Sequence, residues 1–446
     1  MYLNSAINMK LLKTCLFLLI FSLPLLSFSQ LNRVEKKIVK SVDKHNKESI
    51  ELLTKAVNIN SGTMNFEGVR EVGRLFQAEL DKLGFKTELT SGEAYGRAGH
   101  LIATHEGKPG LRLLLIGHLD TVFELDSPFQ DSSMENDSIM KAPGVADMKG
   151  GDVVIILAMR ALKEAGVLDE MSVKIVMTGD EEKSGDPIEL SKKDLVDGAK
   201  WADVALGFEN GDGNPETIVI SRRGSSSWKL EVSGNAAHSS QVFTEKVGAG
   251  AIYEASRILN EFYTQLSSEE NLTFNPGFIL GGTSVDTKED GTGGSALGKT
   301  NVVAQKAIVR GDIRAVSLDQ LDRAKTVMNK IVADNYPQTA AKLSFDDGGY
   351  PPLAPADGNK QLLEYYTEIS EDLGFGEVYA VNPRNAGAAD ISFTTGHVEM
   401  AVDGLGLSGA DDHTVNETGN LNMVSRQAKR AAILMYRLSK NSRFEK

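Results

Sequence analysis

Side chains that can bind a metal or move a proton follow the apolar run LLLIGHLD at residues 113–120. His118 and Asp120 are two residues apart, and side chains at that spacing on a strand point to the same side. An imidazole that binds a metal commonly donates its other N–H to a carboxylate, which fixes the orientation of the ring. The pair therefore predicts a metal-binding histidine supported by Asp120.

Acidic residues also border other apolar runs. Asp147 lies in APGVADMKGG, just before a predicted helix, Glu181 and Glu182 follow SVKIVMTGD, and Glu209 follows ADVALGF. A second histidine, His413, ends the segment GLGLSGADDH. Taken singly, each residue has an ordinary interpretation as a helix cap, a turn residue or a hydrogen-bonded core side chain. Their recurrence favours one shared site.

Convergence of these groups would crowd five carboxylates, and their mutual repulsion would raise their pKa values or open the site. Two divalent cations would offset that charge, and paired metals can act on both the attacking and the accepting oxygen of a hydrolysis. The five carboxylates belong to Asp120, Asp147, Glu181, Glu182 and Glu209.

The apolar runs before these residues predict the strands that must position them. Strand-like segments lie at 100–106, 111–120, 172–180 and 202–209, and helical periodicity marks 31–58, 66–83 and about 148–165. This alternation predicts an α/β fold, with a mostly parallel mixed sheet and helices on both faces. Reactive groups in such sheets gather beyond the carboxyl ends of the strands, where these acids fall.

The pattern changes at about residue 221. Strands are expected near 225–233, 272–281, 301–314 and 341–347, with helices at 247–266 and 318–335, and 288–300 is expected to be a mobile loop. This βαββαβ order predicts an inserted α+β domain at 221–348. The flanking segments 30–220 and 349–446 would form one catalytic domain, which ends in a helix at about 421–438.

The N-terminus predicts a secretory signal. Lys10 and Lys13 precede the apolar run CLFLLIFSLPLL, and cleavage after Ser29 would export the protein to the periplasm or the medium, without a membrane anchor. Cleavage would also remove Cys15, the single cysteine, which leaves histidine and acidic side chains as metal ligands. Loss of two lysines takes the formal net charge from −13 to −15, which argues against nucleic-acid or anionic-lipid partners.

The series H-x-D, D-M-K-G-G, D-E-E, a strand-terminal Glu and a late His resembles the M20 family of metallopeptidases, most closely its glutamate carboxypeptidase branch. The resemblance covers essentially the whole chain after residue 29. It implies two zinc ions per subunit, one bound by His118, Asp147 and Glu209, and the other by Asp147, Glu182 and His413. Asp147 would bridge the two ions.

The resemblance also implies that Glu181 is the general base and that Asp120 is the partner of His118. Neighbouring residues in an extended segment point in opposite directions, so Glu182 can bind a metal while Glu181 faces the attacking water. Zinc lowers the pKa of a bound water to about 7, so the base needs only to accept a proton and pass it to the leaving amine.

Further residues are implied by the same resemblance. His238 in SGNAAHSS is similar to a histidine that stabilises the developing oxyanion in the partner subunit, and Arg314 in GDIRAVS to an arginine that binds a substrate carboxylate. Asn301 in TNVV matches a substrate-contacting asparagine. The segment PRNAGAADIS departs from the family's longer glycine run, and Arg384 within it is a candidate contact for the substrate carboxylate. A homodimer through the inserted domain is implied as well.

Three functions fit these observations. The first is a two-zinc carboxypeptidase that removes a C-terminal residue, glutamate being one possibility, and the second is an N-acyl amino acid deacylase. Both reactions cleave an amide next to a free carboxylate, so the sequence leaves them open. The third is a dimeric binding protein that keeps the fold without catalysis. An aminopeptidase is disfavoured because that class is expected to lack the inserted domain.

Overall fold

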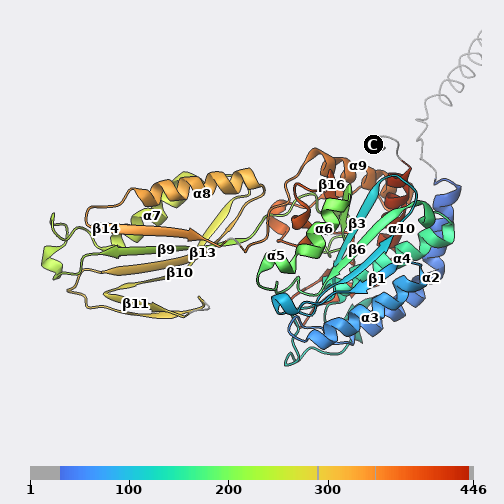
Figure 1. The fold of residues 1–446 in the computed structure, drawn as a ribbon, viewed down its shortest axis with the longest axis horizontal. Helices are drawn as coiled ribbons and strands as arrows, with labels where there is room; N and C mark the ends of the chain where they lie inside the picture. Colours follow the sequence, from blue (N-terminus) through green and yellow to red (C-terminus); the bar gives the residue numbers. More distant parts are fainter. Residues whose placement is uncertain (1–30, 289–290, 347, 441–446) are drawn as a thin grey trace, which may run out of the picture.

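The computed structural model describes residues 31–288, 291–346 and 348–440, so the predicted signal at 1–29 lies outside the described residues. Two regions are apparent in Figure 1, a main domain and an inserted domain that extends from it along the long axis of the molecule. Within the described part of the chain, none of the helices combines the length and apolar character that a membrane span requires.

The main domain is built on a six-stranded sheet in which four neighbouring strands pair in parallel, and β2, the second strand from one edge, pairs antiparallel with both of its neighbours. In spatial order, the strands are β1 (Lys86–Leu89), β2 (Leu101–His105), β6 (Ser172–Thr178), β3 (Arg112–His118), β7 (Val204–Gly207) and β16 (Met400–Val402). The predicted fold class, a mostly parallel mixed sheet, is confirmed.

Helices cover both faces of this sheet, and the central strand β3 shows why. Leu113 and Leu115 join one hydrophobic core, whereas Leu114 and Ile116 join another on the opposite face. Successive strand residues point to opposite faces, so a strand with both faces buried must be apolar at every position.

The helices form two layers. Helices α4 and α10 pack in the first core together with α2, α3 and α9, and α6 packs in the second core beside the turn at 390–394. Their bounds are α2 (Arg33–Val57), α3 (Phe66–Lys82), α4 (Gly150–Ala165), α5 (Ile188–Ser191), α6 (Lys193–Trp201), α9 (Asp357–Asp372) and α10 (Asn422–Ser439).

A small sheet lies beside the main one and joins distant parts of the sequence. Its strands are β17 (Gly409–Ala410), β18 (Thr418–Asn420), β5 (Ile139–Lys141) and β4 (Ser133–Met134), in that order. A separate parallel pair forms between β8 (Thr217–Ile218) and β15 (Tyr379–Ala380). The β17–β18 connection, which contains His413, is thereby held near the segment that precedes α4.

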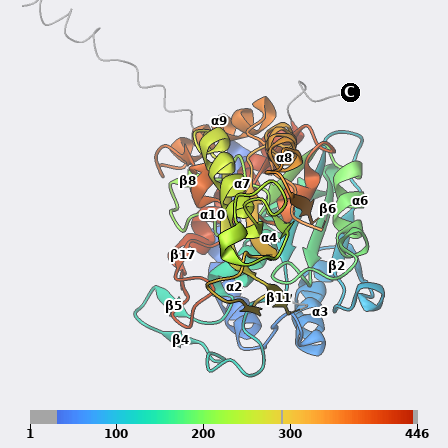
Figure 2. The ribbon, with the colours of Figure 1, turned by 90° about the vertical axis from the view of Figure 1, so that its left-hand side faces the viewer.

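The inserted domain is an antiparallel four-stranded sheet with two helices on one face (Figures 1 and 2). Both helices contribute to a hydrophobic core of their own with the sheet. In spatial order the strands are β10 (Thr273–Gly282), β13 (Lys306–Arg314), β9 (Ser226–Gly234) and β14 (Thr339–Phe345), and the helices are α7 (Ala251–Leu266) and α8 (Leu318–Ala333).

One expectation for this domain was wrong in part. The glycine-rich segment that was expected to be a mobile loop contains a strand, because β11 (Ser284–Thr287) pairs antiparallel with β12 (Gly294–Leu297). The hairpin packs beside β10, where Gly294 lies against the side chain of Leu280. Small residues have little intrinsic preference for strands. Packing against β10 therefore accounts for this hairpin better than its local sequence does.

Candidate metal centre

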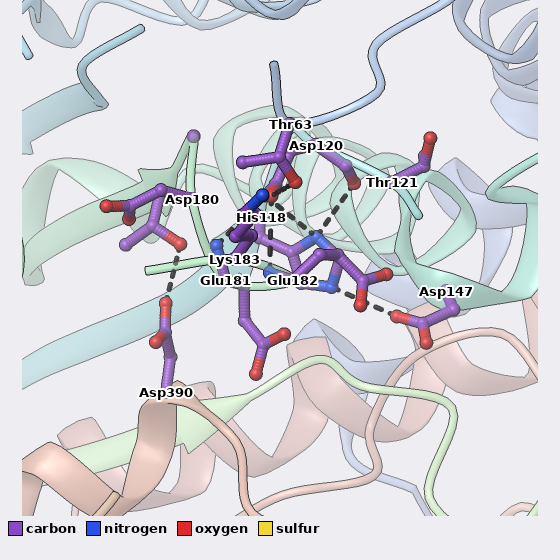
Figure 3. Close-up of polar contacts among 12 residues, drawn as sticks. Thr63, His118, Asp120, Thr121, Asp147, Asp180, Glu181, Glu182, Lys183 and Asp390 are labelled. Atoms are coloured by element: carbon purple, nitrogen blue, oxygen red, sulfur yellow. Dashed lines mark hydrogen bonds and ion pairs between the residues drawn. The ribbon is translucent and has the colours of Figure 1, made fainter. Parts of the chain in front are cut away.

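His118, the last residue of β3, lies at the centre of a first group of possible metal ligands. Its Nε2 is 3.0 Å from Oδ1 of Asp147 and 3.5 Å from Oε1 of Glu209 (Figure 3 shows the Asp147 contact). One potential ligand atom of each residue lies within 4.8 Å of the others. His118 is buried, and the side chains of the two acids are each 12% exposed.

A second group shares Asp147 with the first. Nε2 of His413 is 3.0 Å from Oδ2 of Asp147 and 3.1 Å from Oε2 of Glu182. These three residues also place one ligand atom each within 4.8 Å of the others. The two oxygens of Asp147 therefore face different histidines, which is the arrangement of a ligand that bridges two cations.

Strand register explains how the first residues meet. His118 pairs with Thr178 across β3 and β6, and Glu181 and Glu182 come just after that pair. Ile116 pairs with Gly207 across β3 and β7, so His118 and Glu209 each lie two residues beyond paired positions. Because these strands are parallel neighbours, their carboxyl ends present the side chains at one edge of the sheet.

Asp120 supports the site through the main chain as well as through His118. Its Oδ1 accepts the N–H of Glu181 at 3.1 Å and lies 3.5 Å from Nδ1 of His118, whose hydrogen bond goes to the main-chain carbonyl of Asp120 at 3.0 Å. Its Oδ2 accepts the N–H of Glu182 at 3.2 Å and the Thr63 hydroxyl at 2.7 Å (Figure 3). The predicted partner of His118 is thus also the anchor of the loop that carries Glu181 and Glu182.

Two buried acids that the sequence reasoning did not single out perform similar tasks. Glu417 accepts the N–H groups of Gly144, Ala146 and Asp147 at 2.9–3.1 Å and so holds the segment that carries the shared ligand. Asp403 accepts the N–H of Glu209 at 3.1 Å. Asp403 follows an apolar strand as the predicted ligands do, so that signal was available, whereas Glu417 has none in the sequence.

Contacts of Tyr350 and Lys192 also hold the loop that carries Glu181. The Tyr350 hydroxyl donates to the carbonyl of Glu181 at 2.9 Å. Lys192, fully buried, lies 3.2 Å from Oδ1 of Asp180 and 3.0 Å from Oδ1 of Asp390. Satisfied buried networks of this kind restrict the conformations of the loop that they hold.

Burial and neighbouring negative charge disfavour ionisation of the carboxylates of the site. Burial raises the pKa of Glu209 well above its ordinary value, and the charge of Asp147 adds to the effect. Burial likewise raises the pKa of Glu181 well above its ordinary value, with Asp390 and Glu182 adding to it. The pKa of Glu182 is raised to about 7 by burial and by Asp147. Positive charge nearby is therefore required to ionise these groups together.

The histidines and Asp147 show the opposite tendency. Hydrogen bonds to Asp147 and Glu182 raise the pKa of His413 to about 11. Burial alone would lower the pKa of His118, but Glu209, Asp120 and Asp147 raise it well above its ordinary value. Burial by itself raises the pKa of Asp147, yet His118 and His413 outweigh it and hold that pKa below its ordinary value. Bound protons thus supply positive charge that divalent cations could replace.

A further observation indicates that these residues suit divalent cations. Oε1 of Glu182 is buried and has no hydrogen-bond partner among the described residues, which is costly unless a cation or water contacts it. The donors are imidazole nitrogen and carboxylate oxygen, which suit zinc and similar divalent metals. His118, Asp147 and Glu209 form one group that could hold a divalent cation, and Asp147, Glu182 and His413 form a second.

The predicted residues of the inserted domain lie apart from this centre. His238 bonds Ser240 through Nδ1 and bridges to Val302, next to Asn301, within the inserted domain. Arg314 ends β13, and its Nε is 3.1 Å from Oδ2 of Asp312. Arg384 lies in a turn of the main domain with its side chain exposed. The metal ligands are thus brought together within the chain, whereas His238 and Asn301 are not brought to them.

Comparison with known proteins gives a family match that covers the whole candidate site. The sequence pattern of the Peptidase family M20/M25/M40 matches residues 114–437, which include every candidate metal ligand. Carboxypeptidase G2 of Pseudomonas sp. (strain RS-16) is 27% identical over 375 residues, which cover 82% of this chain and 83% of that protein.

Two other similarities extend this comparison. A probable succinyl-diaminopimelate desuccinylase of Staphylococcus aureus (strain MSSA476) is 25% identical over 386 residues, covering 81% of this chain and 90% of that protein. The crystal structure of aminopeptidase PepT from Bacillus cereus ATCC 10987 has a TM-score of 0.67 at 19% identity and covers 88% of this chain and 98% of its own. The structural similarity shows a shared fold.

Without cations, the folded protein should lose stability as the pH rises from 5 to 8. The pKa of Glu182 is about 7 in the fold against an ordinary 4.5, so its contribution to stability is present below pH 4.5 and lost as the pH rises through 7. His413 acts in the same direction above pH 6.5, its pKa being about 11 in the fold. Chelator-treated protein should therefore show a melting temperature a few degrees lower at pH 8 than at pH 5.

Differential scanning fluorimetry on chelator-treated and zinc-loaded protein measures this effect. The zinc-induced rise in melting temperature should be larger at pH 8 than at pH 5, because the acids are then free of protons. Glu182→Gln should weaken the pH dependence of the metal-free form. A metal-free protein that becomes more stable from pH 5 to pH 8 would contradict the assignment.

Asp120→Asn should weaken zinc binding about 10- to 100-fold, the range found for groups that orient metal ligands. An amide has one oxygen, so it cannot accept the N–H groups of Glu181 and Glu182 on both sides as the carboxylate does. Competition with a fluorescent chelator gives the zinc affinity. Asp126→Asn, an exposed change in the loop that follows, is the control and should leave that affinity unchanged. Equal zinc affinities in the two variants would reject the supporting role of Asp120.

Proposed function

The chain belongs to the peptidase family M20/M25/M40 and is a metallohydrolase, and we propose that it uses two zinc ions per subunit to hydrolyse an amide bond next to a free carboxylate. The observation that carries the proposal is the pair of three-residue ligand groups that share Asp147. A C-terminal residue, glutamate being one candidate, would leave with the new amine.

The side chains of the site have separate roles in the proposed hydrolysis. Bound divalent cations would polarise the scissile carbonyl and lower the pKa of the attacking water. Glu181, which is in neither ligand group, accepts the proton of that water and delivers it to the leaving nitrogen. Asp120 and Tyr350 hold the main chain of Glu181 in place from its N–H and its carbonyl. Arg314 would bind the carboxylate of the substrate, and Asn301, which lies beside His238, would contact a substrate together with that histidine.

The identity of the acyl group separates two forms of this proposal. Carboxypeptidase G2 and the desuccinylase differ in name as a carboxypeptidase and a deacylase, and both cover more than four-fifths of this chain. An N-acyl amino acid deacylase therefore remains the alternative to a carboxypeptidase. An aminopeptidase was expected to lack the inserted domain. The matched aminopeptidase structure covers 88% of this chain, so the inserted domain does not argue against an aminopeptidase.

We also propose a homodimer formed by the inserted domain. Ile252 and Tyr263 on α7 and Ile279 on β10 are 47–68% exposed. Ile252 lies beside β10, because a Cβ at Gly281 would come within 2.8 Å of its Cγ1. An edge strand with apolar side chains next to it is suited to pairing with a second copy. His238, which lies away from the metal ligands of its own chain, would then serve the site of the partner subunit.

Light scattering after size-exclusion chromatography at about 10 µM should give the mass of two chains. Ile252→Asp combined with Ile279→Asp should give the mass of one chain, because two carboxylates would be buried in the interface. Leu318→Asp, on the exposed part of α8, is the control and should leave the dimer intact. A wild-type protein that elutes as a monomer would overturn the dimer.

Glu181→Gln should lower kcat by about 10²- to 10⁴-fold with zinc still bound, because the amide cannot accept the proton. The assay uses zinc-loaded protein with a panel of dipeptides and N-acyl amino acids, and bound zinc is measured by mass spectrometry of the native protein. Glu189→Gln, an exposed change in α5, is the matched control and should keep full activity.

The panel also distinguishes the alternatives. Cleavage of acylated amino acids but not of peptides would identify a deacylase. Loss of cleavage when the substrate's N-terminus is blocked would identify an aminopeptidase. Two bound zinc ions without hydrolysis of any amide would reject the enzyme proposal and favour the binding protein.

A further inference from the structure

The two segments that connect the main domain to the inserted domain pair with each other. Arg222 and Leu353 exchange main-chain hydrogen bonds, each at 2.9 Å, and the N–H of Ser225 donates to the carbonyl of Tyr350 at 2.9 Å. We call residues 222–225 and 350–353 the connecting ribbon. The inserted domain is thus attached through one paired element and not through two independent links.

Asn359 on α9 fixes the base of the connecting ribbon to the main domain. Its side chain is buried, and Nδ2 donates to the carbonyl of Ile220 at 2.9 Å and to that of Ala354 at 3.0 Å. Its Oδ1 accepts the N–H of Ala401 on β16 at 2.8 Å. One amide therefore holds both segments just outside the ribbon and ties them to the edge of the main sheet.

The side chain of Tyr350 joins the connecting ribbon to the loop that carries Glu181. Its hydroxyl donates to the carbonyl of Glu181 at 2.9 Å and lies 3.1 Å from Oγ of Ser184 in the same loop. Its ring packs against Phe393, with the ring centroids 5.0 Å apart. Movement of this strand of the ribbon would therefore disturb the contact with Glu181.

The side chain of Arg222 joins the other strand of the ribbon to the loop that carries Glu209. Its Nε donates to Oδ2 of Asp403 and its Nη1 donates to the carbonyl of Gly387, both at 2.9 Å. Oδ1 of Asp403 accepts the N–H of Glu209 at 3.1 Å. Arg222 and Asp403 are both buried, and removal of one member of such a pair leaves an uncompensated charge. The position of Glu209 thus depends on a side chain of the ribbon.

We propose that the connecting ribbon couples the attachment of the inserted domain to the metal centre. Tyr350 is the positioning residue for Glu181, and this role rests on the amide hydrolysis proposed above. Arg222 is the positioning residue for Glu209, a candidate ligand. The loops of these two acids follow β6 and β7, which flank β3 on opposite sides. The ribbon therefore reaches the candidate metal centre from both sides of His118.

Zinc binding must in turn stabilise the connecting ribbon, because coupling between two sites is reciprocal. In zinc-saturated protein, the hydrogen-bonded amides of Arg222, Ser225 and Leu353 should exchange about tenfold more slowly than in metal-free protein, whereas amides of α8 should change by less than about twofold. Mass spectrometry of peptides covering 219–225 and 348–356 measures this exchange. In the double variant Tyr350→Phe with Arg222→Lys, saturating zinc should slow the ribbon amides by less than about threefold. No slowing in the wild type, or full slowing in the double variant, would overturn the coupling.

Single variants separate the two positioning roles. Tyr350→Phe should lower kcat about tenfold and leave KM and zinc affinity within about twofold, because Glu182 keeps its own main-chain contact with Asp120. Arg222→Lys keeps the charge beside Asp403 but loses the planar fork, so it should weaken zinc binding about tenfold in competition with a chelator. A structural role alone would lower kcat and zinc affinity together in both variants, and that result would overturn the separate roles.

A tyrosine and an arginine elsewhere in the main domain supply the matched controls. Tyr379→Phe removes the hydrogen bond of an exposed hydroxyl to Glu377. Arg437→Lys alters a partly buried arginine that bonds Glu35 and Asp372. Both should leave kcat, zinc affinity and ribbon exchange within about twofold of wild type.

The exchange measurement also separates this coupling from the proposed function. Zinc-induced slowing in a protein that hydrolyses no amide would uphold the coupling and reject the proposed function. Hydrolysis without that slowing would reject the coupling and leave the proposed function standing.

Discussion

The structure depends on holding several carboxylates at one edge of a sheet, where burial and mutual repulsion oppose their ionisation. Glu181, Glu182 and Glu209 all have pKa values raised above the ordinary range, and the histidines beside them have theirs raised as well. Such a group of acids is stable when cations or protons balance it. The fold meets this constraint by fixing the acids through main-chain contacts, so that their side-chain oxygens remain available.

Those main-chain contacts share one design. Asp120 and Asp403 each follow a strand, and each accepts N–H groups of the loop that carries a candidate ligand. Glycines make room for buried acids at the same edge, because a Cβ at Gly117 would lie 2.1 Å from Oδ1 of Asp152, and one at Gly207 would lie 2.3 Å from Oδ1 of Asp403. The small residues just before the ligands thus allow close packing behind them.

Much of this could be predicted because strand ends are visible in sequence. Apolar runs mark β3, β6 and β7, and parallel neighbours bring the residues after them together, as with His118 and Glu209. Glu417 could not be predicted, since its partners lie about 270 residues away and nothing in its local sequence marks it as buried. The β11–β12 hairpin was not predicted for a related reason, since its small residues have little strand propensity. The roles assigned to His238 and Asn301 stay predictions.

The metal centre and Arg314 of the inserted domain bear on how a substrate would lie. Cations bound at the metal centre would attract the carbonyl oxygen of a scissile amide, and Arg314 would attract a carboxylate of the same substrate. Arg222, at the start of the connection to the inserted domain, donates to Asp403, and Asp403 accepts the N–H of Glu209, so this connection is joined to the candidate metal centre. An aminopeptidase must instead accept a free ammonium group next to the scissile bond, and guanidinium groups would repel it. An arginine beside the site would therefore support the proposed hydrolysis at a carboxylate terminus over hydrolysis at an amino terminus.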